Sequence, residues 1–168
     1  MISKKVCMLG VFAVGKTALV QKYVRSIFSD RYLSTVGVKI SKVEVNADGV
    51  DTCLVLWDLE GKDFYTEINL PYLRGAMGYF LVVDGTRRET LDTAMELRAK
   101  VTEMVGAVPH IILLNKCDLK DNWEITEDDI SALEKQNIPV VKTSAKTGQS
   151  VNEAFLSLTR AMHCFQST

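Results

Sequence analysis

Residues 10–17 combine glycine, lysine and threonine in the spacing of a loop that binds a chain of phosphates. Their sequence, GVFAVGKT, matches the pattern G-x-x-x-x-G-K-[ST] without a mismatch. Glycine at both ends lets the backbone wrap closely around an anion, and successive N–H groups at a helix N-terminus then face it. Lys16 places a positive charge on the β- and γ-phosphates, and Thr17 offers a hydroxyl to Mg²⁺. The predicted phosphate-binding residues are Gly10, Ala13, Val14, Gly15, Lys16, Thr17 and Ala18.

An aspartate at the end of a later apolar run indicates a metal site. The run Leu54–Trp57 is followed by Asp58, and Gly61 lies three residues beyond, which gives D-x-x-G. An aspartate at a strand end can hold Mg²⁺ through water in nucleotide-hydrolysing folds with a phosphate loop. The N–H of Gly61 can approach a terminal phosphate. This short motif is also typical of a simple strand-to-loop turn, so its weight comes from the phosphate loop elsewhere in the chain.

Residues 115–118 carry a motif that can select a purine base. They read N-K-C-D directly after the apolar run His110–Leu114. A carboxylate only accepts hydrogen bonds, so Asp118 can take both the N1–H and the exocyclic amine of guanine, whereas adenine lacks that donor pair. Asn115 is expected to brace the pocket and contact the base, and the stem of Lys116 to lie along the nucleotide.

A fourth motif, Ser144-Ala145-Lys146, follows the last predicted strand and can offer the N–H of Ala145 to the guanine carbonyl. It is weak alone, but the four motifs follow four different predicted strands. The carboxyl ends of parallel strands meet at one edge of a sheet, where ligands bind in open α/β folds. The order of the motifs therefore predicts a single nucleotide site.

Short apolar runs that alternate with helical patterns must position these motifs. The strand-type runs are Val6–Leu9, Val38–Val45, Val50–Trp57, Tyr79–Val83, His110–Leu114 and the weaker Ile138–Val141. Helical patterns cover Ala18–Phe28, the stretch around Leu97–Met104, a start at Ile125–Asp129, and Val151–Met162. This alternation predicts a layered α/β domain with a mainly parallel sheet, to which the hairpin at Asp48-Gly49 adds one antiparallel edge strand.

Composition and charge narrow the class of protein. The 168 residues are 47% apolar and 24% charged, which suits one compact domain and excludes disorder. The net charge of −1 argues against a generic nucleic-acid binder. No secretory signal is evident, so the four cysteines are expected to be reduced thiols in a cytoplasmic protein. Cys164 is fifth from the end, whereas a prenylation signal needs the fourth, so no lipid anchor is evident.

On these motifs the chain resembles the small GTPases of the Ras superfamily. The run Tyr72–Ala76 followed by Tyr79–Asp84 is similar to the Rab branch, and the resemblance covers nearly all 168 residues. It implies a three-layer Ras-like G domain with a phosphate loop, formed by residues 1–168 as a single unit. By the same resemblance the sheet has six strands, of which the second is antiparallel, and the protein alternates between GTP and GDP forms.

The resemblance also assigns roles that the motifs alone do not. It implies that Phe28 stacks on guanine and that Thr35 binds Mg²⁺ in the GTP state, together with Thr17 and with Asp58 acting through water. Segments 29–38 and 60–74 are the expected switches, ordered by the γ-phosphate and read by effector and regulator proteins. Lys16, Thr35, Gly61 and the residue after Gly61 are the expected catalytic positions.

Two positions depart from the family pattern. Lys62 follows Gly61, where the family usually has a glutamine that orients the attacking water, and Glu60 replaces a small residue. Lysine has donors but no acceptor, so it cannot accept a hydrogen bond from that water, and we expect slow unaided hydrolysis. Alternatively, Glu60 and Lys62 pair with each other or face solvent.

One aromatic and two basic residues leave further alternatives open. Phe12 stands in the phosphate loop where the family often has a tiny residue; it either obstructs an arginine supplied by a partner or packs outward under a switch. Arg87 and Arg88 are expected to form a solvated helix start rather than a catalytic pair.

The sequence therefore predicts a GTP- and GDP-binding switch that uses Mg²⁺ and slowly hydrolyses GTP. A GTP-binding scaffold with negligible unaided hydrolysis is the alternative, which Glu60 and Lys62 favour. A third interpretation, a kinase or adenine-specific ATPase with a phosphate loop, is opposed by Asp118.

Overall fold

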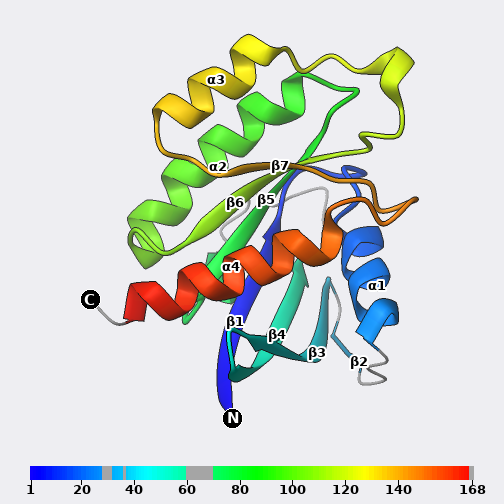
Figure 1. The fold of residues 1–168 in the computed structure, drawn as a ribbon. Helices are drawn as coiled ribbons and strands as arrows, with labels where there is room; N and C mark the ends of the chain where they lie inside the picture. The colour runs from blue at the N-terminus through cyan, green and yellow to red at the C-terminus, as the bar shows by residue number, and fades with distance from the viewer. Residues whose placement is uncertain (28–31, 36, 60–69, 167–168) are drawn as a thin grey trace.

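The computed structural model describes residues 1–27, 32–35, 37–59 and 70–166, and its centre is one seven-stranded sheet. The spatial order of the strands is β2-β3-β4-β1-β5-β6-β7 (Figure 1). The strands are β1 (Ile2–Leu9), β2 (Tyr32–Thr35), β3 (Val38–Ala47), β4 (Val50–Leu59), β5 (Gly78–Asp84), β6 (His110–Asn115) and β7 (Val140–Lys142). Strands β4, β1, β5, β6 and β7 are mutually parallel, whereas β3 is antiparallel to β4 and β2 to β3.

The predicted fold class is confirmed, and every predicted strand is present. The sheet has one strand more than expected, because Tyr32–Thr35, inside the first predicted switch segment, pairs with Val38–Ser41. The strand predicted at 38–45 is therefore an edge strand only beyond Ser41. Four residues are too few for an alternating pattern to distinguish a strand from a loop.

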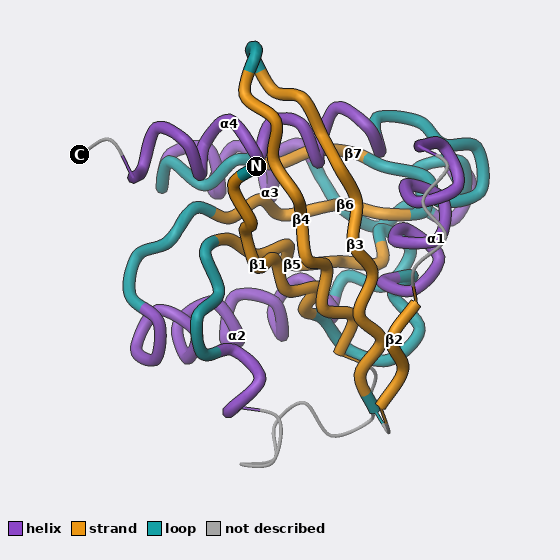
Figure 2. The backbone as a smooth tube through the Cα atoms, turned by 90° about the horizontal axis from the view of Figure 1, so that it is seen from below, coloured by secondary structure: helices purple, strands orange, loops and turns teal. Residues whose placement is uncertain are grey.

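Helices cover both faces of the sheet. Helices α1 (Lys16–Ile27) and α4 (Val151–Gln166) contact each other and the β3 side of one face, whereas α2 (Glu89–Val105) packs on β5 and α3 (Glu127–Lys135) on β7. Figure 2 shows α4 on one side of the strands and α2 on the other. Two short 3-10 turns, η1 (Leu70–Leu73) and η2 (Lys120–Asn122), complete the described elements.

Strand β5 shows how the sheet separates two hydrophobic cores. All seven of its residues are buried. Phe80 and Val82 belong to the core beneath α1 and α4, whereas Tyr79, Leu81 and Val83 belong to the core beneath α2. Side chains alternate between the faces of a strand, so a strand covered on both faces is apolar throughout. This is why the run Tyr79–Val83 is recognisable in the sequence.

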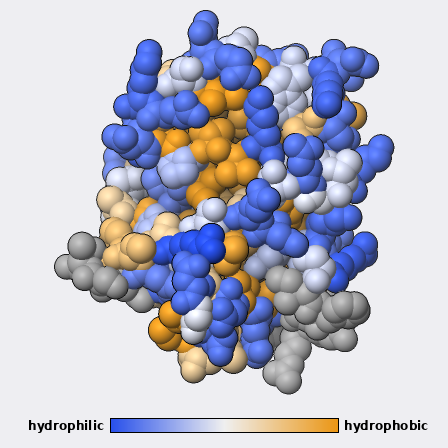
Figure 3. Space-filling model, in the orientation of Figure 1, coloured by the Kyte–Doolittle hydropathy of each residue, from blue (hydrophilic) through white to orange (hydrophobic). Residues whose placement is uncertain are grey.

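The character of the surface and the state of the cysteines can be compared with the expectations from composition. Hydrophilic residues are spread over the face shown in Figure 3, and an apolar band crosses its centre. All four cysteines are free thiols, as expected. Within the described ranges, no helix has the length and apolar character needed to cross a bilayer.

The core beneath α1 and α4 contains an aromatic stack that provides a test of this fold. The rings of Tyr23 and Phe155 lie 3.8 Å apart and nearly parallel, and Phe80 lies 4.8 Å from Phe155. Phe155→Ala should lower the free energy of unfolding by about 3–5 kcal/mol, because it leaves a cavity in a packed core. Phe165→Ala, on the same helix with 50% of the residue exposed, should cost less than about 1 kcal/mol. Chemical denaturation measures both, and equal losses would contradict the assigned packing.

Candidate functional site

The glycines that bound the phosphate loop are required by the sheet around it. Gly10 has φ +150°, and a Cβ there would lie 2.5 Å from the backbone oxygen of Val82 on β5. Gly15 has φ +103°, and a Cβ would lie 2.3 Å from Nδ2 of Asn115. Both distances are shorter than real Cβ contacts, so the two positions admit only glycine. The sequence assigned these glycines to close approach of a ligand, whereas the structure gives them contacts within the protein.

Side-chain donors hold five successive backbone carbonyls of this loop. Each carbonyl from residue 10 to residue 14 accepts a hydrogen bond from an amide, an ammonium or a guanidinium group. The donors are Lys16 Nζ to Gly10 O (2.7 Å) and Val11 O (3.0 Å), Arg87 Nη2 to Phe12 O (3.0 Å), Lys116 Nζ to Ala13 O (3.0 Å), and Asn115 Nδ2 to Val14 O (3.0 Å). The path of the loop is thus fixed by its own Lys16 and by residues from two other parts of the chain.

This arrangement determines where the amides of the loop point. In a trans peptide the C=O of one residue and the N–H of the next point in opposite directions. The N–H groups of Ala13, Val14 and Gly15 therefore point away from the donors that hold the preceding carbonyls. Helix α1 begins at Lys16, two residues earlier than predicted, so its positive N-terminal end adjoins these amides. Amides and a helix N-terminus arranged in this way suit an anion such as phosphate.

The predicted metal ligands Thr17 and Asp58 lie together. The Thr17 hydroxyl donates a 2.6 Å hydrogen bond to Oδ2 of Asp58, which is buried near the end of β4. Hydroxyl and carboxylate oxygens are the hard donors that Mg²⁺ prefers, and Mg²⁺ commonly takes few protein ligands beside phosphates and water. In the described part of the chain, no cluster of three or more His, Cys, Asp or Glu side chains could hold a metal by itself. The pair therefore fits Mg²⁺ bound together with phosphate oxygens.

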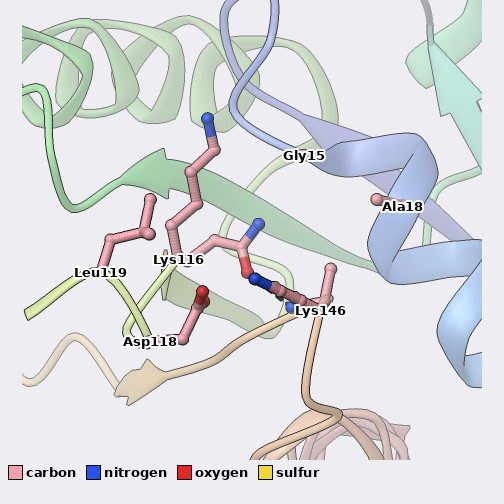
Figure 4. Close-up of a pocket in the computed structure, with 8 residues that line it drawn as sticks. Gly15, Ala18, Lys116, Asp118, Leu119 and Lys146 are labelled. Atoms are coloured by element: carbon pink, nitrogen blue, oxygen red, sulfur yellow. Dashed lines mark hydrogen bonds between the residues drawn. The ribbon is translucent and has the colours of Figure 1, made fainter.

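A cavity of about 340 Å³ lies beside the phosphate loop. Figure 4 shows that its walls come from the loop after β1, the first turn of α1, and the loops that follow β6 and β7. The lining residues are Gly15, Ala18, Asn115, Lys116, Asp118, Leu119, Ala145 and Lys146. Three motifs that are far apart in the sequence thus form one pocket, as predicted from their positions after parallel strands.

Hydrogen bonds orient the polar side chains of this pocket. Asn115 accepts at Oδ1 from the Thr143 hydroxyl and from the N–H of Ala145, both at 3.2 Å. The hydroxyl of Ser144 donates to Oδ1 of Asp118 at 2.7 Å. The second carboxylate oxygen of Asp118 can accept from a ligand, whereas the N–H of Ala145, which the sequence assigned to a base carbonyl, donates to Asn115 in the structure. Thr143 was not identified in the sequence, because its role depends on the spatial neighbour Asn115.

Several predicted positions lie outside the described residues. These are Phe28, Glu60, Gly61 and Lys62, together with residues 29–31 and 36 of the first predicted switch segment and the rest of 60–69 in the second. Thr35 is the last residue of β2, but its side chain is not among those described.

The structure corrects the prediction for Arg87 and adds detail to those for Arg88 and Phe12. Arg87 is not simply a solvated residue at a helix start, because it reaches the carbonyl of Phe12 and also donates from Nε to Asp84 at 3.1 Å. Arg88 turns the other way and pairs with Asp92 and Asp129. Phe12 is 63% exposed, so the phosphate loop carries an exposed aromatic residue.

A pair of glycine substitutions tests whether the close approach at Gly15 matters. Gly15→Ala should reduce the affinity for GDP by at least about tenfold, because the new Cβ displaces Asn115 from the loop. Gly106→Ala is the matched control: it also has a positive φ, of +81°, but its Cβ would meet nothing within 4 Å. That control should lower stability by about 1 kcal/mol through backbone strain and leave GDP affinity unchanged. Equilibrium titration with GDP separates the two, and equal affinities would contradict the assigned contact.

Comparison with known proteins agrees with this geometry. A sequence model of the Ras family matches residues 5–164. The chain is 32% identical to the Ras-related protein Rab-13 of Canis lupus familiaris over 158 residues, which cover 93% of this chain and 78% of the relative. It is 32% identical to human Rab-8B, covering 93% and 76%, and 36% identical to human Rab-7L1 over 166 residues, covering 94% and 81%. The chain therefore belongs to the Ras family of small GTP-binding proteins, with Rab proteins among its relatives.

Proposed function

We propose that residues 1–168 form a single G domain that alternates between GTP and GDP forms and slowly hydrolyses GTP. The observation that supports this proposal is that two parts of the site, here called half-sites, adjoin: the phosphate loop and the pocket beside it. A loop whose amides face outward adjoins a 340 Å³ pocket in which Asp118 is held by Ser144. A triphosphate on the loop and a guanine in the pocket would belong to one molecule, since Gly15 borders both.

In this proposal each half-site recognises one part of the nucleotide. The amides of the loop and the ammonium of Lys16 bind the β- and γ-phosphates. Asp118 accepts from N1–H and the exocyclic amine of guanine, and the N–H of Ala145, which contacts Asn115 in the structure, is shared with the guanine carbonyl. The stem of Lys116, which lines the pocket, lies along the nucleotide. Phe28 stacks on the base, as the family resemblance implies. Lys146 lines the same pocket and completes the set of nucleotide-binding residues.

The proposed metal is Mg²⁺, held by Thr17, by Thr35 in the triphosphate state, and by Asp58 through water. Bound there, it would neutralise charge on the phosphate oxygens. The short contact between Thr17 and Asp58 supports this assignment because it brings two hard oxygen donors together beside the loop.

Hydrolysis in this proposal consists mainly of positioning and charge stabilisation. A water attacks the γ-phosphorus, the bond to the bridging oxygen of GDP breaks, and inorganic phosphate leaves. Lys16 and the loop amides stabilise the charge that develops, and the N–H of Gly61 contacts the terminal phosphate. Lys62 has no acceptor for a hydrogen bond from the water, so the intrinsic rate is slow. Segments 29–38 and 60–74 change conformation with the γ-phosphate, so effectors and regulators bind the GTP form through them. The proposed location of the protein is the cytoplasm.

A second candidate function is a GTP-binding scaffold with negligible unaided hydrolysis. Glu60 and Lys62 favour it, because a carboxylate beside the γ-phosphate and a lysine in place of the usual glutamine both oppose catalysis. The two candidates share the nucleotide site and differ only in turnover.

Substitution of Asp118 tests the base pocket. Asp118→Asn should weaken GDP binding at least about a hundredfold, because the amide then opposes one donor of guanine with a donor of its own. The same variant should gain affinity for xanthosine diphosphate, whose carbonyl replaces the exocyclic amine. Asp121→Asn, on the exposed turn η2, is the control and should leave both affinities unchanged. Competition binding measures the preference; an unaltered preference in Asp118→Asn would remove this residue from the pocket.

Substitution of Lys62 separates the switch from the scaffold. Lys62→Gln should raise the single-turnover rate of GTP hydrolysis about tenfold, since glutamine can both accept from the attacking water and donate to phosphate. Lys135→Gln, exposed at the end of α3, is the control for loss of one positive charge. A detectable rate in the unmodified chain supports the switch, and none supports the scaffold. A rate unchanged by Lys62→Gln would refute the assigned cause of slow hydrolysis.

A further inference from the structure

The carboxylate of Asp84 lies between two cations at the end of β5. Its side chain is only 2% exposed. Oδ2 accepts from Lys116 Nζ at 2.8 Å and from Arg87 Nε at 3.1 Å. Oδ1 accepts from both the N–H and the hydroxyl of Thr86. Burial alone would raise the pKa of Asp84, but the hydrogen bonds from Lys116, Thr86 and Arg87 outweigh it and lower the pKa to about 2. The group is therefore a carboxylate at any pH at which the protein is studied.

Both cations also contact the phosphate loop, at adjacent residues. Lys116 Nζ donates to the carbonyl of Ala13 and Arg87 Nη2 to that of Phe12, each at 3.0 Å. The planar guanidinium allows Arg87 to use separate N–H groups for the carboxylate and the carbonyl. Asp84 thus connects the end of β5 to two successive peptide units of the loop, through Lys116 on one side and Arg87 on the other.

We infer that Arg87 is a positioning residue that fastens the phosphate loop and slows the release of bound nucleotide. This inference rests on the proposed binding of GTP and GDP. The carbonyl of Phe12 and the N–H of Ala13 belong to the same planar peptide unit, so the bond from Arg87 fixes the direction of that N–H. An amide that is already aligned needs no reorganisation to hold a phosphate.

The next residue provides a matched control. Arg88 is the same residue type, and its side chain is 40% exposed, against 39% for Arg87. It forms ion pairs with Asp92 on α2 and Asp129 on α3, and its backbone N–H donates to Glu124; none of these three partners belongs to the phosphate loop. Removal of either arginine costs one half-exposed positive charge together with its ion pairing. Only the removal of Arg87 frees the carbonyl of Phe12.

The test is the release of a fluorescent GDP analogue from the full chain in the presence of Mg²⁺ and excess GDP. Arg87→Gln should accelerate release about fivefold to tenfold, as expected for loss of a half-exposed charged hydrogen bond at the binding loop. Arg88→Gln should stay within about twofold of the unmodified chain. The denaturation midpoints of the two nucleotide-free variants should fall by similar amounts, because each variant loses one half-exposed guanidinium and its ion pairing.

A second measurement is specific for the phosphate loop. The affinity for GMP, which ends at the α-phosphate, should change less in Arg87→Gln than the affinity for GDP. Unchanged release from Arg87→Gln overturns the inference, as does equal acceleration in both variants or an equal loss of GMP and GDP affinity. GDP binding by the unmodified chain is measured first, before any variant is made. If that chain does not retain GDP, both the proposed function and this inference are overturned.

Discussion

The orientation of the peptide units between Gly10 and Val14 is the constraint on which the site depends. Five carbonyls with partial negative charge would otherwise face the binding region or solvent, and each is held by a side-chain donor. Three of those donors carry a full positive charge, which polarises the peptide units and strengthens the positive ends of their dipoles. The fold supplies this arrangement, and the loop sequence alone does not.

The parallel sheet brings the donors to the loop. Arg87 follows β5, while Asn115 and Lys116 stand at the end of β6; both strands run parallel to β1, which leads into the loop. Parallel neighbours end at the same edge, so residues separated by more than a hundred positions become contacts without any long excursion of the chain. The same geometry places the loop after β7 against Asn115 and closes the pocket. Residues of the candidate site thus lie at strand ends, at the start of α1 and in the loops between them, and the rigid strands fix where those loops start.

The sequence was sufficient for features that depend on local spacing. The glycine-rich loop, Asp58 at a strand end and the N-K-C-D motif follow apolar runs that are recognisable without a structure, and the structure joins them. Arg87 and Thr143 were missed because their partners, Phe12 and Asn115, are distant in the sequence. The strand Tyr32–Thr35 was missed because four residues carry too little pattern, and pairing with β3 defines it. Gly15 was predicted to let the backbone wrap around an anion, but its close approach to Asn115 was not predicted.

Asn115 couples the part of the site that faces the phosphates to the part that faces the base. Its amide nitrogen touches the loop at Val14, while its oxygen touches the N–H of Ala145 and the hydroxyl of Thr143. One rigid, planar group therefore transmits any displacement of the phosphate side to the base side. When a nucleoside and a free pyrophosphate are added as separate fragments, each binds its own part of the site. Neither fragment then benefits from the alignment of Asn115 that the other would produce. The binding free energies of the two fragments therefore need not sum to that of the intact molecule. The covalent link between sugar and phosphate contributes to affinity because it brings both groups to the site together.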